Sequence, residues 1–330
     1  MTIEYSRCLS QAFVDVMTDP KGLRFLLDLL EEWQKKDPGG LDLQLRHGDE
    51  VMLYRGGTCV LKVSFNDGQP EYVTFSAHKN YIENRPAFEP LGGKKSIAEL
   101  PKLKKHVKAY LLNVMPDVTD TWYDSEKSEG YWENQLSCFY GNKHWRESME
   151  WLIVDRQVII SHADQRHKDE FFAPFQDKYD GIKNRLYEKH KRPKRTQRWS
   201  QPPADKNEQL DMLAIGPDGE LVLVELKHMK NPGLYWAPIQ AAFYLDVFEK
   251  AMPAVSAGAA RLIEQKVELG LLPKRALNRV PPEGFRSMKS ILMIAEASYK
   301  KKTWDRLSEV IECIGKPELS VVALPGKNGK

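Results

Sequence analysis

The segment from Gln209 to Lys227 constrains the fold of this chain most. It contains two apolar runs, QLDMLAI and LVLVELK, which are joined by the turn sequence Gly-Pro-Asp-Gly. Two short runs around such a turn predict a β-hairpin. Because both faces of the runs are apolar, we expect the hairpin to be buried on both sides, as in a sheet covered by helices.

The expected register of this hairpin brings two acidic residues together. Asp211 and Glu225 are equally far from Asp218 at the centre of the turn. They should therefore face each other across the ladder, with Cβ atoms about 5 Å apart. Lys227 lies two residues beyond Glu225 and points to the same face. Facing carboxylates cost stability, so a cation between them is the natural compensation. The alternative is a hairpin that ends early, with the three residues at a solvated strand end.

This arrangement resembles the signature of the PD-(D/E)xK nuclease superfamily. The matching residues are Asp211 and Glu225-Leu226-Lys227, with Leu210 in place of the signature proline. Downstream, Gln240-Ala-Ala-Phe-Tyr244 is similar to the Q-x-x-x-Y element of the RecB-like (RecB/Mrr-like) branch.

Two upstream segments extend the resemblance. His144–Ser148 resembles a W-x-E-S helix of some bacterial members, and Arg198–Pro202 resembles their first core strand. The resemblance covers about residues 131–300. It implies a restriction-endonuclease-like mixed-sheet core flanked by helices.

The resemblance also implies a mechanism. Asp211 and Glu225 would bind Mg²⁺ or Mn²⁺, with the Leu226 carbonyl as a further ligand, and the metal would activate a water and neutralise phosphate charge. Lys227 would position or deprotonate that water, or bind the scissile phosphate. Gln240 and Tyr244 would orient Lys227 or touch the DNA backbone.

A carboxylate from the upstream helix would complete the metal shell or bind a second ion. Glu147 is the preferred candidate, with Glu133 and Glu150 as alternatives. The choice between a one-metal and a two-metal mechanism stays open.

A basic run precedes the proposed site and predicts contact with nucleic acid. Six Lys and Arg residues lie within residues 189–198, where they can neutralise phosphates. The alternative is a solvated loop. The residues expected to bind nucleic acid, with the Trp stacking on a base, are Lys191, Arg192, Lys194, Arg195, Arg198 and Trp199.

Composition excludes several classes of protein. With 49 Lys and Arg against 46 Asp and Glu, the net charge of +3 excludes a wholly basic nucleic-acid binder. No apolar run approaches the roughly 18 residues of a membrane span, and the N-terminus lacks a signal-peptide pattern. The four cysteines form no CxxC and indicate reduced thiols. We therefore expect a cytoplasmic protein with no membrane association.

The pattern along the chain predicts an α/β (α+β overall) protein of two domains. Residues 1–125 would form an N-terminal β-rich module of unknown role, with a helix over residues 20–36, about four antiparallel strands over 41–77, and a helix from a capping box at Ser96 to about Met115. Residues 126–330 would form the nuclease-like domain.

Within the second domain, helices and strands are expected to alternate. One or two helices would occupy residues 131–154, and a helix at 169–189 would be interrupted near Pro174. After the hairpin, the expected order is helices at 238–251 and 259–269, a strand at 290–297, a helix at 304–314 and a strand at 319–325.

These features favour a metal-dependent DNA endonuclease, with a role in restriction or phage defence implied by the resemblance. A homodimer is one arrangement that fits cleavage of both strands, and protein partners stay open. The first alternative is a non-catalytic DNA-binding or assembly module on a nuclease fold. The second is an RNA-directed or exonucleolytic nuclease.

Overall fold

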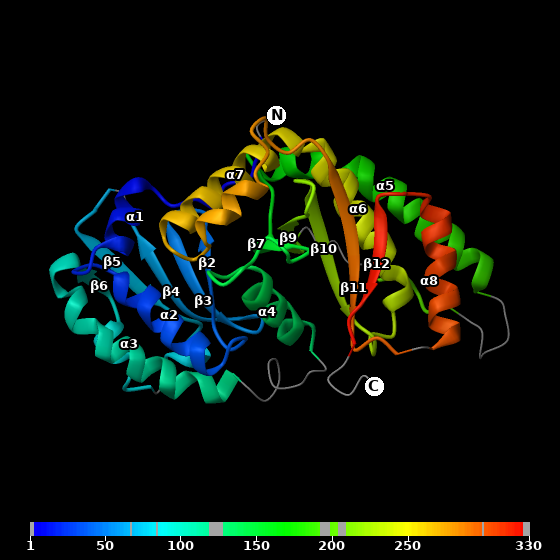
Figure 1. Cartoon of the computed structure of the whole chain (residues 1–330). Helices are drawn as coiled ribbons and strands as arrows, with labels where there is room; N and C mark the ends of the chain where they lie inside the picture. The colour runs from blue at the N-terminus through cyan, green and yellow to red at the C-terminus, as the bar shows by residue number, and fades with distance from the viewer. Residues whose placement is uncertain are drawn as a thin grey trace. The chain divides into compact units, whose positions relative to one another are not determined.

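A computed structural model describes residues 3–66, 68–83, 85–118, 128–191, 199–203, 209–298 and 300–325. It has a mixed α+β fold, which confirms the expected fold class (Figure 1). The chain forms two compact units. Unit 1 comprises Met1–Tyr5, Arg156–Ala259 and Arg279–Lys330, and unit 2 comprises Ser6–Asp155 and Ala260–Asn278.

The main sheet of unit 1 is mixed and has the strand order β12-β11-β10-β9-β7. Its strands are β7 (Leu152–Val158), β9 (Leu210–Ile215), β10 (Leu221–His228), β11 (Met288–Ala295) and β12 (Leu319–Ala323). β10 pairs in parallel with β11, and β11 with β12, whereas β9 and β10 form the predicted antiparallel hairpin. Nearly every residue of β9, β10 and β11 is buried, as expected for strands covered on both faces.

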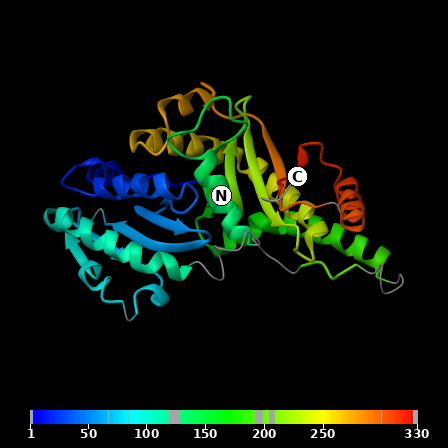
Figure 2. The same ribbon diagram turned by 60° about the horizontal axis from the view of Figure 1, so that its bottom comes forward.

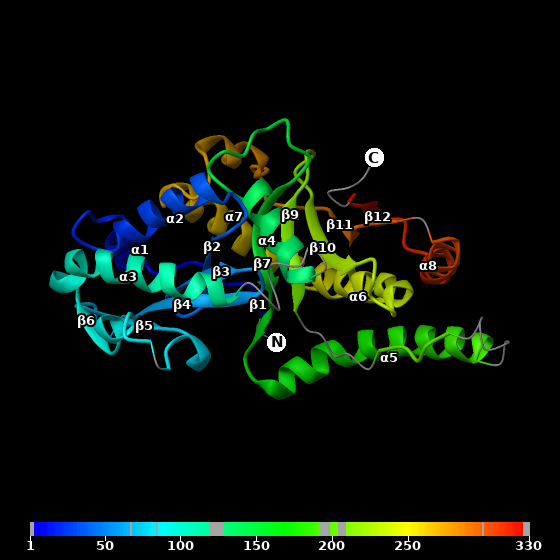
Figure 3. The same cartoon turned by 90° about the horizontal axis from the view of Figure 1, so that it is seen from below.

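Helices cover this sheet. α6 (Ala237–Lys250) packs directly on β10 and β11, and both α5 (Gln165–His190) and α8 (Lys301–Ile314) pack on α6. Figure 3 shows α6 between the sheet and α5. α7 (Met252–Glu268) begins in unit 1. A short ladder of β1 (Ile3–Glu4) and β8 (Ser161–His162) completes the described strands of this unit.

Unit 2 contains an antiparallel meander with the order β2-β3-β4-β5-β6. Its strands are β2 (Asp42–Arg46), β3 (Glu50–Arg55), β4 (Thr58–Phe65), β5 (Tyr72–Ser76) and β6 (Lys94–Ser96). Its helices are α1 (Gln11–Thr18), α2 (Arg24–Lys36), α3 (Leu100–Val114) and α4 (Glu129–Tyr140). α2 and α3 pack side by side (Figure 2). The predicted capping box between Ser96 and Glu99 is confirmed, and it opens a short 3-10 turn that leads into α3.

The division of the chain differs from the predicted boundary at 125/126. Unit 2 keeps α4, which packs on β2 and β3, and it also takes the second half of α7. The division falls within β7, between Asp155 and Arg156. The polar stretch near 117–130 is therefore not the boundary between the units. The contacts of α4 with the meander place α4 in unit 2.

Two local expectations were wrong, and one helix was missed. α1 was not predicted, although Ser10 caps it and Phe13 is buried on its inner face. The segment expected to be helical over 131–154 is helical only through α4 and ends in β7. α5 continues through Pro174. Proline has no backbone N–H, so the carbonyl of Glu170 loses its helical hydrogen bond. The helix tolerates this loss because both residues are exposed to water. Over the described residues, every helix is too short or too polar to cross a bilayer.

Candidate active site

The register of the β9–β10 hairpin is the one predicted from the sequence. Leu213 pairs with Leu223 and Met212 with Val224, where the paired ladder ends, and Asp211 and Glu225 are the next residues of the two strands. Asp211 Oδ2 also accepts a hydrogen bond from the backbone N–H of Leu226 at 2.7 Å. The hairpin therefore brings the two acidic residues together at the end of two buried strands.

The Lys227 ammonium lies among oxygens from three neighbouring residues. Lys227 Nζ donates a hydrogen bond to Glu225 Oε1 and another to the Leu226 carbonyl at 3.2 Å, and it lies 3.9 Å from Asp211 Oδ2. The Glu225 side chain is 0% exposed and that of Lys227 is 14% exposed. A buried carboxylate is costly without a cation, and Lys227 supplies that charge here.

The donor atoms of this site suit a divalent metal. The carboxylates of Asp211 and Glu225 and the carbonyl of Leu226 are hard oxygen donors, which Mg²⁺ and Mn²⁺ prefer. Among the described residues, no group of three or more His, Cys, Asp or Glu side chains is placed to hold a metal ion. The protein's share of a metal shell at this hairpin would be two carboxylates and one carbonyl, with water and substrate phosphate supplying the rest.

Tyr244 lies beside the acidic pair but is buried. Its hydroxyl donates to the carbonyl of Gln209 at 2.6 Å and is also hydrogen-bonded to Gln240. Burial raises the pKa of Tyr244, and the nearby Glu225 raises it further, so the phenol stays protonated. Because its side chain is 1% exposed, the expected contact of Tyr244 with the DNA backbone is wrong. Tyr244 instead fixes the segment that leads into Asp211.

A cavity of about 580 Å³ opens next to Lys227 within unit 1. Gln240 contributes to its wall together with Lys227, so the Q-x-x-x-Y element reaches the site through its Gln. Gln240 and Tyr244 are four residues apart on α6, and this spacing places them on one face of the helix.

The three candidates for an upstream carboxylate belong to unit 2. Glu147 and Glu150 are exposed in a turn region, and Glu133 is buried on α4. Asn278 Nδ2 donates to Glu147 at 2.5 Å within that unit. The expected helix at 144–148 was wrong, because these residues form turns. Trp145 is buried, and its indole N–H donates a hydrogen bond to the Trp151 carbonyl at 2.8 Å.

The basic run is described only in part. Lys191, just beyond α5, forms an ion pair with Glu188. The other four basic residues expected to bind nucleic acid, Arg192, Lys194, Arg195 and Arg198, lie outside the described residues.

Trp199 is a core residue, so its expected stacking on a nucleic-acid base is wrong. It is 3% exposed, and its ring stacks on His190 with centroids 4.4 Å apart. Tyr235 and Trp236 pack edge-on against the same ring, and the Arg306 guanidinium lies 5.6 Å from its centroid. The predicted strand that would contain Trp199 is absent from the described residues 199–203.

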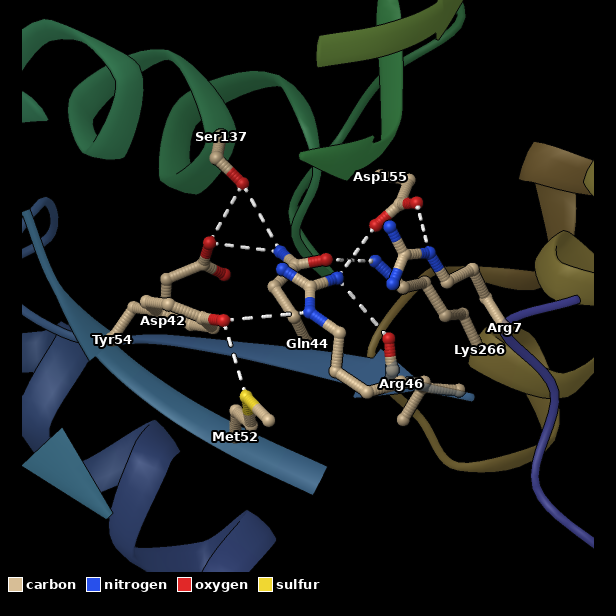
Figure 4. Close-up of polar contacts among 10 residues, drawn as sticks. Arg7, Asp42, Gln44, Arg46, Met52, Tyr54, Ser137, Asp155 and Lys266 are labelled. Carbon is tan, nitrogen blue, oxygen red and sulfur yellow. Dashed lines mark hydrogen bonds and ion pairs between the residues drawn. The ribbon is translucent and has the colours of Figure 1, made fainter. Parts of the chain in front are cut away.

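Unit 2 contains a buried polar network that sequence reasoning missed (Figure 4). Asp155 accepts from Arg7 Nε at 3.0 Å and from Arg46 Nη1 at 2.9 Å. Gln44 donates to Asp42 at 2.8 Å and accepts from Lys266 Nζ at 3.1 Å. All of these side chains are buried.

The network joins segments that are far apart in the sequence and that no motif connects, namely Arg7, the β2 residues Asp42, Gln44 and Arg46, Asp155, and Lys266. It holds the second half of α7, through Lys266, to the meander strand β2, through Gln44. The network therefore helps to explain why that half of α7 belongs to unit 2.

Lys266 is expected to make stability depend on pH. Its burial lowers its pKa below the ordinary 10.5, so just below pH 10.5 the unfolded chain binds more protons at this site than the folded chain. The free energy of unfolding of the wild type, minus that of Lys266→Met, should therefore rise as the pH rises toward 10.5. Urea unfolding of both proteins across this range measures the difference. Lys21→Met, at an exposed position, is the matched control, and a flat difference for Lys266→Met would contradict the assignment.

Comparison with known proteins finds no matching family model, no matching curated protein and no matching solved structure.

Proposed function

We propose that this protein is a metal-dependent endonuclease that hydrolyses DNA phosphodiester bonds. The observation that carries the proposal is the meeting of the Lys227 ammonium with oxygens of Asp211, Glu225 and Leu226 at the end of two buried strands. The mixed sheet with helices packed on it is consistent with the restriction-endonuclease-like core that the sequence resemblance implies.

The residues of the hairpin have distinct roles in this proposal. Asp211, Glu225 and the Leu226 carbonyl would hold Mg²⁺ or Mn²⁺, which when bound supplies positive charge against the phosphate and acidifies water. Lys227 would turn from the carboxylates toward the phosphate, where its ammonium stabilises the charge that develops in the transition state. Tyr244 and Gln240 would keep β9 and the wall beside Lys227 in place.

The buried carboxylate favours this exchange of cations. Glu225 is fully buried, so its charge must be balanced at every stage. Lys227 balances it in the present structure, and a divalent ion would balance it when Lys227 moves to the phosphate. DNA as the substrate, and a role in restriction or phage defence, rest on the sequence resemblance and on the basic run at 189–198.

Cleavage of supercoiled plasmid tests the proposal. With Mg²⁺ or Mn²⁺, the wild type should convert the plasmid to open-circular and linear forms, and EDTA should stop the reaction. Asp211→Asn keeps the shape of the side chain but removes a charge, so it should lower the rate by about 10²-fold or more. Linear DNA and single-stranded RNA, run in parallel, separate endonuclease activity on DNA from exonuclease or RNA cleavage.

One combination of results would overturn the proposal. The protein would cleave no DNA with either metal, yet would bind DNA in a salt-dependent manner, and this binding would survive Asp211→Asn. These results would show a DNA-binding module.

A further inference from the structure

The cavity beside Lys227 has the size of a ligand site. Its volume is about 580 Å³, within the roughly 300–1,000 Å³ of pockets that bury small molecules. It is lined by residues of α5, the segment 199–203, the loop at 231–233 and α6. The hairpin chemistry described above uses only Lys227 and Gln240 from this wall, so most of the cavity has no role in it.

The lining combines an aromatic ring with side-chain amides. Phe243 contributes a partly exposed ring, and Gln176, Gln201 and Gln240 contribute amides. An amide offers both a donor and an acceptor, which match the edge of a nucleobase, and aromatic rings pack against its face. This is the composition used by sites that bind a base removed from its stack.

The charges of the lining favour a phosphate. Lys227 and Lys183 line the cavity together with one carboxylate, that of Asp180. Lys183 Nζ lies 3.3 Å from Asp180 Oδ1 and 3.5 Å from the Pro203 carbonyl. Lys183 is paired with Asp180, and Lys227 is shared with the hairpin, so Lys227 would supply positive charge to the cavity when a divalent ion takes its place beside Glu225.

We propose that this cavity binds an unstacked nucleotide of the DNA strand that is cut, next to the scissile phosphate. The inference rests on the proposed function, because Lys227 is the residue that joins the cavity to the cleavage site. It specifies the substrate as DNA that is single-stranded, or locally opened, at the point of cleavage. Extruding a base costs least where pairing is already lost, so mismatched or single-stranded positions should be preferred.

Calorimetry on the intact protein with Ca²⁺ tests the inference without cleavage. The probes are 5′-dAMP, deoxyribose 5-phosphate, which lacks the base, and a short single-stranded oligonucleotide. The wild type should bind dAMP about tenfold more tightly than deoxyribose 5-phosphate, because stacking on the Phe243 ring adds to the phosphate contact. The oligonucleotide should displace dAMP.

Two variants on α5 form a matched test and control. Gln176→Trp fills the cavity and should lower dAMP affinity about tenfold, to the level of deoxyribose 5-phosphate. Gln165→Trp, on the same helix but exposed and bonded to Asp169, should leave the affinity unchanged. If Gln176→Trp fails to fold, Gln201→Trp fills the cavity from the exposed position 201 instead.

The outcomes separate this inference from the proposed function. Equal affinities for dAMP and deoxyribose 5-phosphate, together with intact plasmid cleavage, would overturn the nucleotide cavity and leave the nuclease standing. Binding of dAMP that the oligonucleotide does not displace would assign the cavity to a free nucleotide and overturn its assignment to the strand. If the wild type does not cleave plasmid DNA at all, the proposed function on which the inference rests is overturned instead.

Discussion

Lys227→Ala is expected to lower the rate of Mg²⁺-dependent DNA cleavage by about 10²- to 10⁴-fold. The substitution removes the ammonium that lies among the oxygens of Asp211, Glu225 and Leu226. In the proposed mechanism this same group stabilises the phosphate in the transition state. Single-turnover cleavage of plasmid DNA at saturating enzyme measures the loss directly, because it is independent of product release.

Lys230→Ala is the matched control for this experiment. Lys230 lies three residues along the chain, is 57% exposed and pairs with Glu296 at 3.6 Å. Its removal should change the cleavage rate less than about threefold. Circular dichroism at the assay temperature checks that the Lys227→Ala protein is folded, since Glu225 stays buried without its ammonium. A folded Lys227→Ala protein that cleaves at the wild-type rate would contradict the proposed role.

Asp155→Asn is expected to lower the free energy of unfolding by about 3–5 kcal/mol. The carboxylate of Asp155 is 1% exposed and balances two buried guanidinium groups, those of Arg7 and Arg46. Asparagine keeps the shape but leaves both positive charges in a site that water does not reach. Urea unfolding at pH 7 measures the change.

The exposed ion pair of Arg24 and Asp28 supplies the control. Its side chains are 48% and 45% exposed, so Asp28→Asn should cost no more than about 1 kcal/mol. Equal losses for the two Asn variants would show that the network around Asp155 is not a buried electrostatic contact.

The hairpin could be predicted from the sequence because its information is local. The turn at Gly216–Gly219 fixes the register, and the apolar residues of both strands fix their burial. The two carboxylates and Lys227 then follow from the alternation of side chains along a strand. Helix ends marked by local chemistry, such as the capping box at Ser96, could be predicted for the same reason.

Features that depend on tertiary contacts could not be predicted in this way. Trp199 follows a basic run, which suggests an exposed ring, yet packing against His190 and Tyr235 buries it. The boundary between the units falls inside a strand and a helix, where composition does not change. Arg7, Asp155 and Lys266 meet only when the meander and α7 are folded, so their shared network leaves no pattern in the sequence.

Anomalous scattering from crystals grown with saturating Mn²⁺ tests the central claim most directly. We expect one Mn²⁺ peak within about 2.5 Å of carboxylate oxygens of both Asp211 and Glu225 and of the Leu226 carbonyl. Lys227 Nζ should then have moved away from Glu225, where it donates a hydrogen bond in the present structure. A Mn²⁺ peak bound elsewhere, or none at this hairpin under saturating metal, would contradict the assignment of the site.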